Sequence, residues 1–136
     1  ASTAFVLIVE DDAAHGEAIA EGLKREGHAC KVVSSGADAI ASVSARPPDV
    51  VITDYKLGGA LNGMDVLRQT KEISPHTQVI LITAFGSEQL VRDALGPKTH
   101  ARNDYLIKPI DIDVVRRKVN EAAEQATAAR DSKTMR

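Results

Sequence analysis

The sequence has few means of stabilising a fold other than aliphatic packing. Aromatic residues make up 3% of its 136 residues and Trp is absent, so the core must be built from aliphatic side chains. A single cysteine, Cys30, excludes an internal disulfide and is typical of a reducing compartment. No apolar run reaches the length of a membrane span, and the N-terminus lacks a signal-peptide pattern. We therefore expect a cytoplasmic protein that does not enter a membrane.

An excess of charge of one sign is also missing. The 17 Lys and Arg residues against 19 Asp and Glu give a net charge of −2, so we expect no direct binding of nucleic acid. The short basic run Arg116–Lys118 is typical of a solvated helix face. Hydrophobic residues at 43% and charged residues at 26% indicate one soluble globular domain of ordinary composition.

Five short apolar runs predict β-strands. Three of them are continuous and rich in β-branched residues, which is typical of strands buried on both faces of a parallel sheet. The predicted strands are Phe5–Val9, Ala29–Val33, Asp49–Thr53, Gln78–Thr83 and Asp104–Ile107.

Helical patterns follow each of these strands. Their apolar stripes, at a spacing of three and four residues, are Ala18, Ile19, Gly22, Leu23; Ala37, Ile40, Ala41, Ser44; Val66, Leu67, Thr70, Ile73; Leu90, Val91, Ala94, Leu95; and Val115, Val119, Ala122, Ala126. Strictly alternating strands and helices predict an α/β fold in which an open parallel sheet carries helices on both faces.

Polar residues follow the strands at the edge where such sheets bind ligands. Because the carboxyl ends of parallel strands meet there, Glu10, Asp11 and Asp54 should converge with Thr83 and Lys108. Two carboxylates about 4 Å apart repel by about 4 kcal/mol at an effective dielectric constant of about 20. Mg²⁺ would offset this repulsion, since it prefers oxygen ligands. A lysine and a hydroxyl beside the ion would suit a phosphoryl group.

Simpler interpretations apply to some neighbouring residues. Acids that follow a strand often cap the next helix, and we expect this role for Asp12. The four histidines, His15, His28, His76 and His100, show no metal-ligand spacing and are interpreted as surface residues.

The motifs "VLIVEDD", "PDVVITDYKL" followed by "NGMDVL", "VILITAFGS" and "DYLIKPI" stand at these strand ends. In this combination the chain resembles the receiver domains of bacterial two-component response regulators, from Phe5 to about Ala123. The resemblance implies a flavodoxin-like (βα)5 fold with strand order 2-1-3-4-5. It also implies a regulatory phosphoacceptor domain rather than an enzyme, which assists its own phosphorylation and dephosphorylation.

The resemblance further implies roles for individual residues. Asp54 would accept a phosphoryl group from a phosphohistidine on a sensor histidine kinase or a histidine phosphotransfer protein. Mg²⁺ would be bound by Asp11, by Asp54, by Glu10 through water, and by the backbone carbonyl of Lys56.

The remaining implied roles concern the phosphoryl group and the switch. Lys108 would pair with the phosphoryl oxygens, and the Lys108–Pro109 bond would be cis. Thr83 would donate a hydrogen bond to the phosphoryl group, and Tyr105 would be the aromatic residue that moves with it. The surface around the fourth helix and fifth strand would then change.

Two segments depart from the family pattern. "KLGGALNG" has Gly58 where Pro is common and one extra residue before Gly63, which predicts a more mobile loop at 58–63. "ALGPKTHARNDYL" is about three residues longer than usual, and this affects the expected partner surface around residues 96–103.

Two other functions are alternatives to a phosphorylatable receiver. A phosphohydrolase with an aspartyl-phosphate intermediate would need DxDxT after the first strand, and "EDDAA" lacks it. A degenerate receiver that acts as a phosphorylation-independent protein-binding module would be favoured by loss of the acids, Asp54 or Lys108, and none of these is lost. We assign residues 1–124 to the receiver domain and residues 125–136 to a helix end or a linker. Such a linker would lead to an output domain, and a stand-alone regulator is the alternative. The sequence also allows a homodimer.

Overall fold

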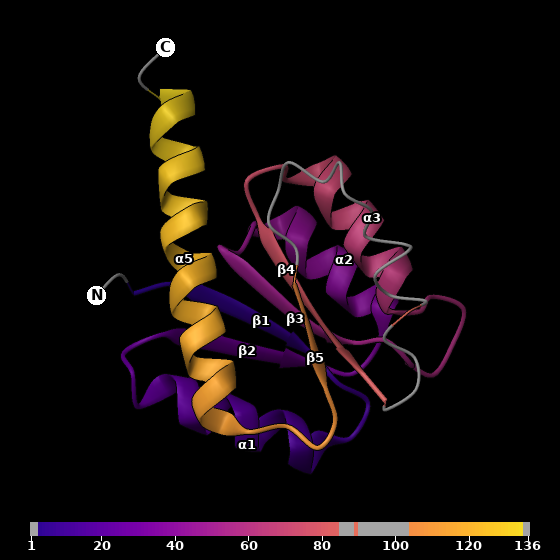
Figure 1. Ribbon diagram of the computed structural model, residues 1–136. Helices are drawn as coiled ribbons and strands as arrows, with labels where there is room; N and C mark the ends of the chain where they lie inside the picture. Colours follow the sequence, from indigo (N-terminus) through magenta and orange to yellow (C-terminus); the bar gives the residue numbers. More distant parts are fainter. Residues whose placement is uncertain (1–2, 85–88, 90–103, 135–136) are drawn as a thin grey trace.

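The computed structural model describes residues 3–84, residue 89 and residues 104–134 (Figure 1). The strands are β1 (Phe5–Val9), β2 (Ala29–Val33), β3 (Val50–Asp54), β4 (Gln78–Thr83) and β5 (Asp104–Ile107). The helices are α1 (Ala13–Lys24), α2 (Gly36–Ala45), α3 (Gly63–Ile73) and α5 (Ile112–Thr134). The predicted helix around residues 90–95 and the segment 96–103 lie outside the described residues.

The five strands form one parallel sheet in the order β2-β1-β3-β4-β5, which confirms the predicted flavodoxin-like topology. Helices α1 and α5 cover one face of the sheet, and α2 and α3 cover the other (Figure 1). Because all strands run in the same direction, their carboxyl ends meet at one edge, where the predicted site residues stand.

The predicted strand Asp49–Thr53 is wrong by one residue. β3 runs from Val50 to Asp54, and Asp54 is still paired with Ile82 of β4. Asp49 instead holds the start of β1, since its Oδ2 accepts a hydrogen bond from the backbone N–H of Phe5 at 2.9 Å. Asp54 therefore belongs to the rigid sheet rather than to the loop that follows it.

Side chains of the central strands alternate between two aliphatic clusters. Val6 and Ile8 of β1 pack towards α1 and α5, whereas Leu7 and Val9 pack towards α2 and α3. All four side chains are almost completely buried. The core is aliphatic, as the scarcity of aromatic residues predicts.

The predicted helix stripes are confirmed only in part. On α5, all four predicted residues are buried, and on α3 three of four are buried, while Ile73 at the end of the helix is 42% exposed. On α1, Ala18 is exposed. On α2 the phase is wrong: the helix buries Gly36, Ala39, Ser42 and Val43 instead. Small side chains at nearly every position of α2 leave the hydrophobic period ambiguous.

His28 is buried, so its assignment to the surface is wrong. Its Nδ1 accepts a hydrogen bond from the backbone N–H of Ala4 at 3.0 Å, and its Nε2 lies 2.9 Å from Oδ1 of Asn120 on α5. Only 4% of the residue is exposed. His28 thus joins the start of β1 to the middle of α5.

Helix α5 projects beyond the sheet at its C-terminal end (Figure 1). Residues 125–134 therefore continue a helix, while the predicted domain boundary at residue 124 stays a prediction.

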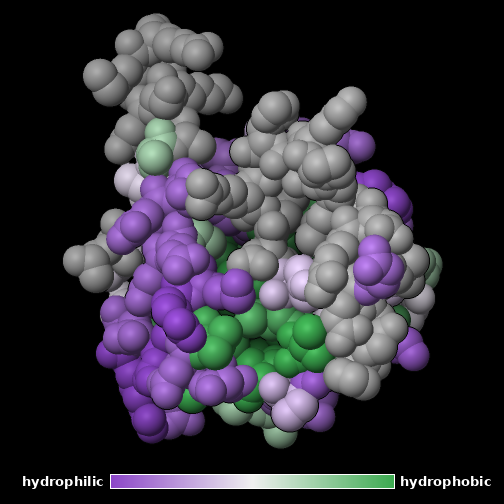
Figure 2. Space-filling view, in the orientation of Figure 1, coloured by the Kyte–Doolittle hydropathy of each residue, from purple (hydrophilic) through white to green (hydrophobic). Residues whose placement is uncertain are grey.

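Figure 2 shows an apolar area on the face of the molecule that is turned to the viewer in Figure 1, beside the hydrophilic surface at the start of α5. Ile107 on β5 and Ile112 on α5 are among the exposed large apolar side chains. Within the described ranges, no helix has the length and apolarity needed to cross a membrane.

Candidate functional site

Two adjacent strands bring the predicted acidic residues together. β1 and β3 pair in parallel with Val9 opposite Thr53, so the next residue along each strand is Glu10 or Asp54. The backbone N–H of Glu10 donates a hydrogen bond to the carbonyl oxygen of Val33 at 3.0 Å, which fixes Glu10 between β2 and β3. Asp11 follows in the turn that leads to α1.

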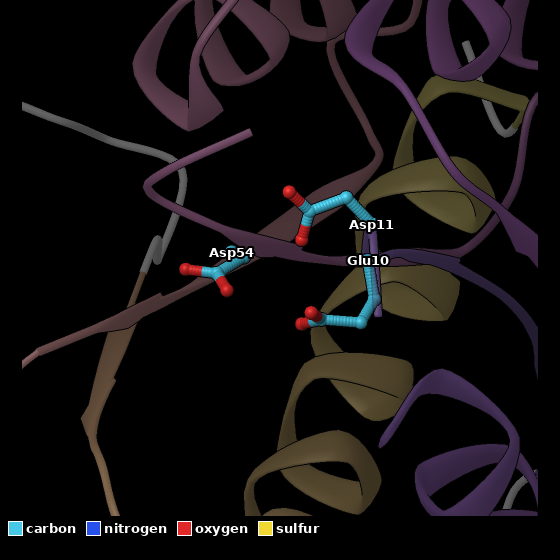
Figure 3. A group of neighbouring side chains, drawn as sticks. All are labelled: Glu10, Asp11 and Asp54. Atoms are coloured by element: carbon cyan, nitrogen blue, oxygen red, sulfur yellow. The ribbon is translucent and has the colours of Figure 1, made fainter. Parts of the chain in front are cut away.

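One carboxylate oxygen from each of Glu10, Asp11 and Asp54 lies within 4.8 Å of the others (Figure 3). Glu10 and Asp54 are buried, with 2% and 5% exposed, whereas Asp11 is exposed. Carboxylates this close repel one another by a few kcal/mol at an effective dielectric constant of about 20. Oxygen donors at this separation fit Mg²⁺, which binds a few protein oxygens and keeps several waters.

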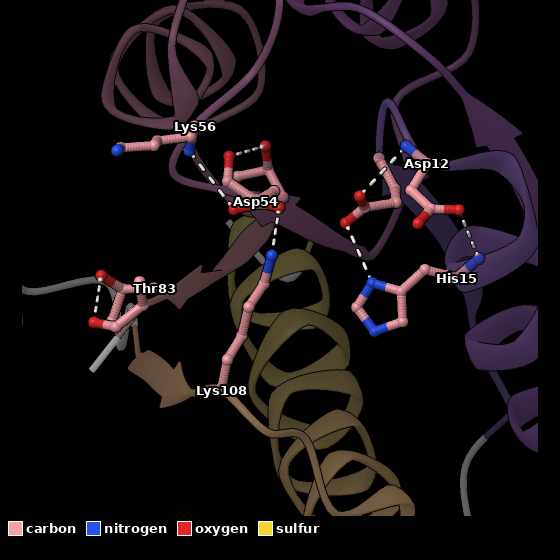
Figure 4. A network of polar contacts seen from close by, with 9 residues as sticks. Asp12, His15, Asp54, Lys56, Thr83 and Lys108 are labelled. Atoms are coloured by element: carbon pink, nitrogen blue, oxygen red, sulfur yellow. Dashed lines mark hydrogen bonds and ion pairs between the residues drawn. The ribbon is translucent and has the colours of Figure 1, made fainter.

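Lys108, at the end of β5, reaches the same acids. Its Nζ donates a hydrogen bond to Oδ2 of Asp54 at 2.7 Å, and the Lys108–Pro109 peptide bond is cis, as predicted (Figure 4). The hydrogen bond to Asp54 is the main reason why the pKa of Lys108 is raised. Burial opposes this shift, and the charges of Asp54, Glu10 and Asp11 add to it. Lys108 therefore stays a cation beside the carboxylates.

The second oxygen of Asp54 contacts its own loop. Oδ1 accepts a hydrogen bond from the backbone N–H of Lys56 at 3.3 Å. The two oxygens of Asp54 thus have different partners, a backbone amide and an ammonium. That the carbonyl oxygen of Lys56 binds a metal stays a prediction.

Burial raises the pKa of Glu10. The backbone N–H of Asp12 opposes this shift, the charge of Asp54 adds to it, and His15 and Lys108 oppose it. Burial disfavours the charged carboxylate, so a cation at this position would interact strongly with it. Oε2 of Glu10 is buried without a hydrogen-bond partner among the described residues, which is consistent with a site that takes an additional ligand.

Thr83 and Tyr105 lie on the face of the sheet that α2 and α3 cover. Thr83 ends β4 and is 1% exposed, and its carbonyl oxygen accepts a hydrogen bond from the backbone N–H of Lys108 at 2.9 Å. Its hydroxyl lies 3.5 Å from the carbonyl oxygen of Ala84. Tyr105 stands opposite Leu81 in the β4–β5 ladder and packs against the cluster beneath α2 and α3. Their predicted roles in a switch stay predictions.

The loop between β3 and α3 is anchored at its end. Asn62 and Asp65 form a reciprocal capping box at the start of α3, a signal that the sequence analysis missed although both residue types suit it. The backbone N–H of Gly63 donates to the carbonyl oxygen of Tyr55 at 2.8 Å. A Cβ atom at Gly63 would clash with the backbone of Asp54, so glycine permits this close approach. The predicted mobility of 58–63 is not tested by these contacts.

His15 also belongs to the site, although the sequence analysis assigned it to the surface. Its side chain is 33% exposed, and Nδ1 lies 3.3 Å from Oε2 of Glu10 (Figure 4). This is an ion-pair contact rather than a hydrogen bond, and Oε2 has no hydrogen-bond partner in the described part of the chain. Asp12 caps α1 as predicted, because its side chain accepts from the backbone N–H of His15. The turn between β1 and α1 folds back on Glu10, so that His15, five residues later in the sequence, contacts its carboxylate.

Comparisons with known proteins agree with this arrangement. The chain matches the family model of the response regulator receiver domain over residues 6–120. It is 36% identical over 120 residues to the luminescence regulatory protein LuxO of Vibrio campbellii, an alignment that covers 88% of this chain and 26% of that protein. The chain spans 20–28% of the length of the curated relatives it matches.

Solved structures give the same family likeness. The receiver domain of NtrX from Brucella abortus is 27% identical, with a TM-score of 0.79 over 88% of this chain and 98% of that one. A response regulator receiver domain protein from Clostridium thermocellum is 28% identical, with a TM-score of 0.82 over 93% of this chain and 98% of that one.

Proposed function

The chain belongs to the family of response regulator receiver domains, and from this we propose that Asp54 accepts a phosphoryl group that switches the domain between two states. The donor is a phosphohistidine on a sensor histidine kinase or on a histidine phosphotransfer protein. The observation that carries the proposal is the convergence on Asp54 of Lys108, at 2.7 Å, and of two further carboxylates.

The transfer is a displacement at phosphorus. A carboxylate oxygen of Asp54 forms the new P–O bond while the P–N bond to the donor imidazole breaks, and the imidazole leaves with the bonding electron pair. Lys108 leaves Oδ2 of Asp54 and pairs with a phosphoryl oxygen, so the ammonium balances negative charge before and after transfer. The buried position of Asp54 keeps it in a fixed orientation towards the donor.

Glu10, Asp11, Asp54 and the carbonyl oxygen of Lys56 would hold Mg²⁺ in this site. When bound, the ion would neutralise charge on the carboxylates and on the phosphoryl oxygens. The chain's own contribution is to keep these oxygens close together against their mutual repulsion.

The proposal is tested by phosphorylation with a small donor such as acetyl phosphate. We expect the intact mass to rise by one phosphoryl group in the presence of Mg²⁺ and to stay unchanged when a chelator removes divalent ions. The modification should be lost on brief treatment with hydroxylamine, which cleaves acyl phosphates. A chain that is labelled equally well without divalent ions would contradict the proposed mechanism.

A phosphorylation-independent binding module remains the alternative function, and the same assay separates the two. If the protein takes up no phosphoryl group in this assay yet binds a partner, the result favours the binding module. The presence of Glu10, Asp11, Asp54 and Lys108 in contact distance favours the phosphoacceptor. We propose further that the domain is regulatory rather than an enzyme and that it acts in the cytoplasm without binding nucleic acid itself. Residues 125–136 are proposed as a helix end or as a linker to an output domain, with a stand-alone regulator as the alternative.

Mg²⁺ is expected to raise the melting temperature of the domain. A ligand that binds only the folded state stabilises it by about 2.7 kcal/mol at 100 times its dissociation constant. For a domain of this size this corresponds to roughly 5–10 °C. In Asp11→Ala the shift should be almost absent, and the metal-free variant should melt at or above the temperature of the metal-free wild type, because one repelling charge is gone. Equal Mg²⁺ shifts in both proteins, measured by scanning calorimetry, would place the ion elsewhere.

Thr83→Ala is expected to uncouple the switch from phosphorylation. The phosphoryl group gains a hydrogen bond if the Thr83 hydroxyl turns from Ala84 towards Asp54, and this movement vacates space beside β4 that Tyr105 can fill. A ligand shifts such an equilibrium only through its different affinity for the two arrangements. The variant should still take the phosphoryl group but lose most of the change at Tyr105 and at 96–103. The measurement is amide chemical shifts with and without beryllofluoride; equal shifts in both proteins would show that Thr83 is not required.

A further inference from the structure

Glu10, Asp12 and His15, at the turn from β1 into α1, form a closed ring of polar contacts (Figure 4). Oε1 of Glu10 accepts a hydrogen bond from the backbone N–H of Asp12 at 3.1 Å. Oδ1 of Asp12 accepts one from the backbone N–H of His15 at 3.2 Å. Nδ1 of His15 lies 3.3 Å from Oε2 of Glu10 and completes the ring.

From this ring we infer that His15 is a positioning residue for the Glu10 carboxylate in the Mg²⁺ site, an inference that rests on the proposed function. His15 does not itself touch the ion. It acts through its polar contact with one oxygen of Glu10, while the Asp12 amide donates a hydrogen bond to the other, so that the carboxylate faces Asp54 as in Figure 3.

The burial of Glu10 makes this contact matter. Its side chain is 3% exposed, so water can replace His15 at Oε2 only poorly. A Glu side chain that is not held loses up to about 2 kcal/mol of rotamer entropy when it is fixed by a ligand. Each carboxylate oxygen has two acceptor sites, so the contacts from Asp12 and His15 leave room for a metal-bound water.

The packing of α1 explains why His15 can reach this far. The next residue, Gly16, lies so close to the sheet that a Cβ atom there would come within 2.8 Å of Cγ1 of Val32 and 3.4 Å of Cβ of Glu10. The first turn of α1 therefore rests directly on Glu10. His15 itself lines a groove of about 320 Å³ between α1 and the start of α5 and belongs to neither core cluster, so we expect a substitution there to leave the core packing intact.

A matched pair of substitutions separates the contact from the shape of the side chain. His15→Leu places a methyl group at the position of Nδ1 and removes the polar contact. His15→Asn places an amide nitrogen there and can restore it. We expect Mg²⁺ to bind His15→Leu with a dissociation constant about tenfold higher than for wild type, since loss of a group that orients a metal ligand typically weakens binding by about 10- to 100-fold. His15→Asn should stay within about threefold of wild type.

The measurement is isothermal titration calorimetry with Mg²⁺ at one neutral pH, together with the melting temperature of each metal-free protein. Similar metal-free melting temperatures with a weaker affinity only in His15→Leu would support the inference. An unchanged affinity in His15→Leu, or an equal loss in His15→Asn, would overturn it. Asp11→Ala serves as the reference without a site. If wild type binds Mg²⁺ no better than this reference, the proposed metal site fails as well, so the two failures are distinguishable.

Discussion

Asp54→Asn is expected to abolish phosphorylation by acetyl phosphate. The amide keeps the size of the carboxylate but lacks its negative charge, so it is a far weaker nucleophile towards phosphorus. The residue ends β3 inside the sheet, paired with Ile82, and the substitution should leave this backbone position unchanged. The measurement is intact mass after incubation with donor and Mg²⁺, in which the variant should show no labelled species.

Asp12→Asn is the matched control for Asp54→Asn. It makes the same change of one carboxylate to an amide close to the site. The side chain of Asp12 caps α1 through its Oδ1, and Asn caps a helix equally well. The contact of Asp12 with Glu10 uses the backbone N–H, which the substitution keeps. Labelling of this control should stay close to that of wild type. Labelling of Asp54→Asn at the wild-type level would show that the acceptor is another residue.

Gly63→Ala is expected to damage both the stability and the site. The new Cβ would lie closer to the backbone oxygen of Asp54 than atoms normally approach, 2.8 Å from Cα of Tyr55 and 3.0 Å from Cδ2 of Leu81. The first two atoms belong to the backbone, so no change of rotamer relieves the contact. Overpacking of this kind costs about 1–3 kcal/mol, or roughly 4–10 °C in melting temperature.

The same clash should also slow phosphorylation, because the backbone that it displaces carries the acceptor Asp54. A misplacement of about 1 Å in a reacting group can slow a reaction by about 100-fold. We therefore expect Gly63→Ala to be phosphorylated far more slowly than wild type even at temperatures where it is folded. Rates from a time course of intact mass and melting temperatures from circular dichroism test both effects.

Gly58→Ala provides the control from the same loop. The nearest atom to its new Cβ would be Oδ2 of Asp11 at 3.9 Å, an ordinary contact, and Gly58 is not among the glycines with positive φ in the described chain. Its stability should change by no more than about 0.5 kcal/mol. If Gly63→Ala behaves like this control, the close approach of α3 to β3 does not constrain the site.

The order of elements and the edge that carries the acids could be predicted because their causes are local. Continuous apolar runs such as Phe5–Val9 are typical of buried strands, and helical stripes between them favour parallel pairing. That topology predicts Glu10 and Asp54 at the same edge of the sheet, and the pairing of β1 with β3 brings them together there. Errors appeared where the local signal is weak, as in α2, whose small side chains fit several helical phases.

Other features depend on how distant segments settle against each other. His28 is buried because it meets Asn120, 92 residues later, once α5 has packed on the sheet. Lys108 pairs with Oδ2 of Asp54, and not with Oδ1, because of where β5 ends relative to the neighbouring strands of the sheet. The approach of α1 at Gly16, which brings His15 to Glu10, depends on a few tenths of an ångström in helix position.

The sequence by itself therefore determined the alternation of strands and helices and the set of residues at the strand ends, because these follow from patterns within short windows of the chain; the strand order came from the family resemblance. The tertiary structure decided which atoms touch: His15 on Glu10, Lys108 on Oδ2 of Asp54, and Gly63 on the backbone of β3. The physical reason is that hydrogen bonds and close packing vary over distances shorter than 1 Å. Hydrophobic periodicity specifies which face of a helix is buried, but it does not specify the helix position to that accuracy.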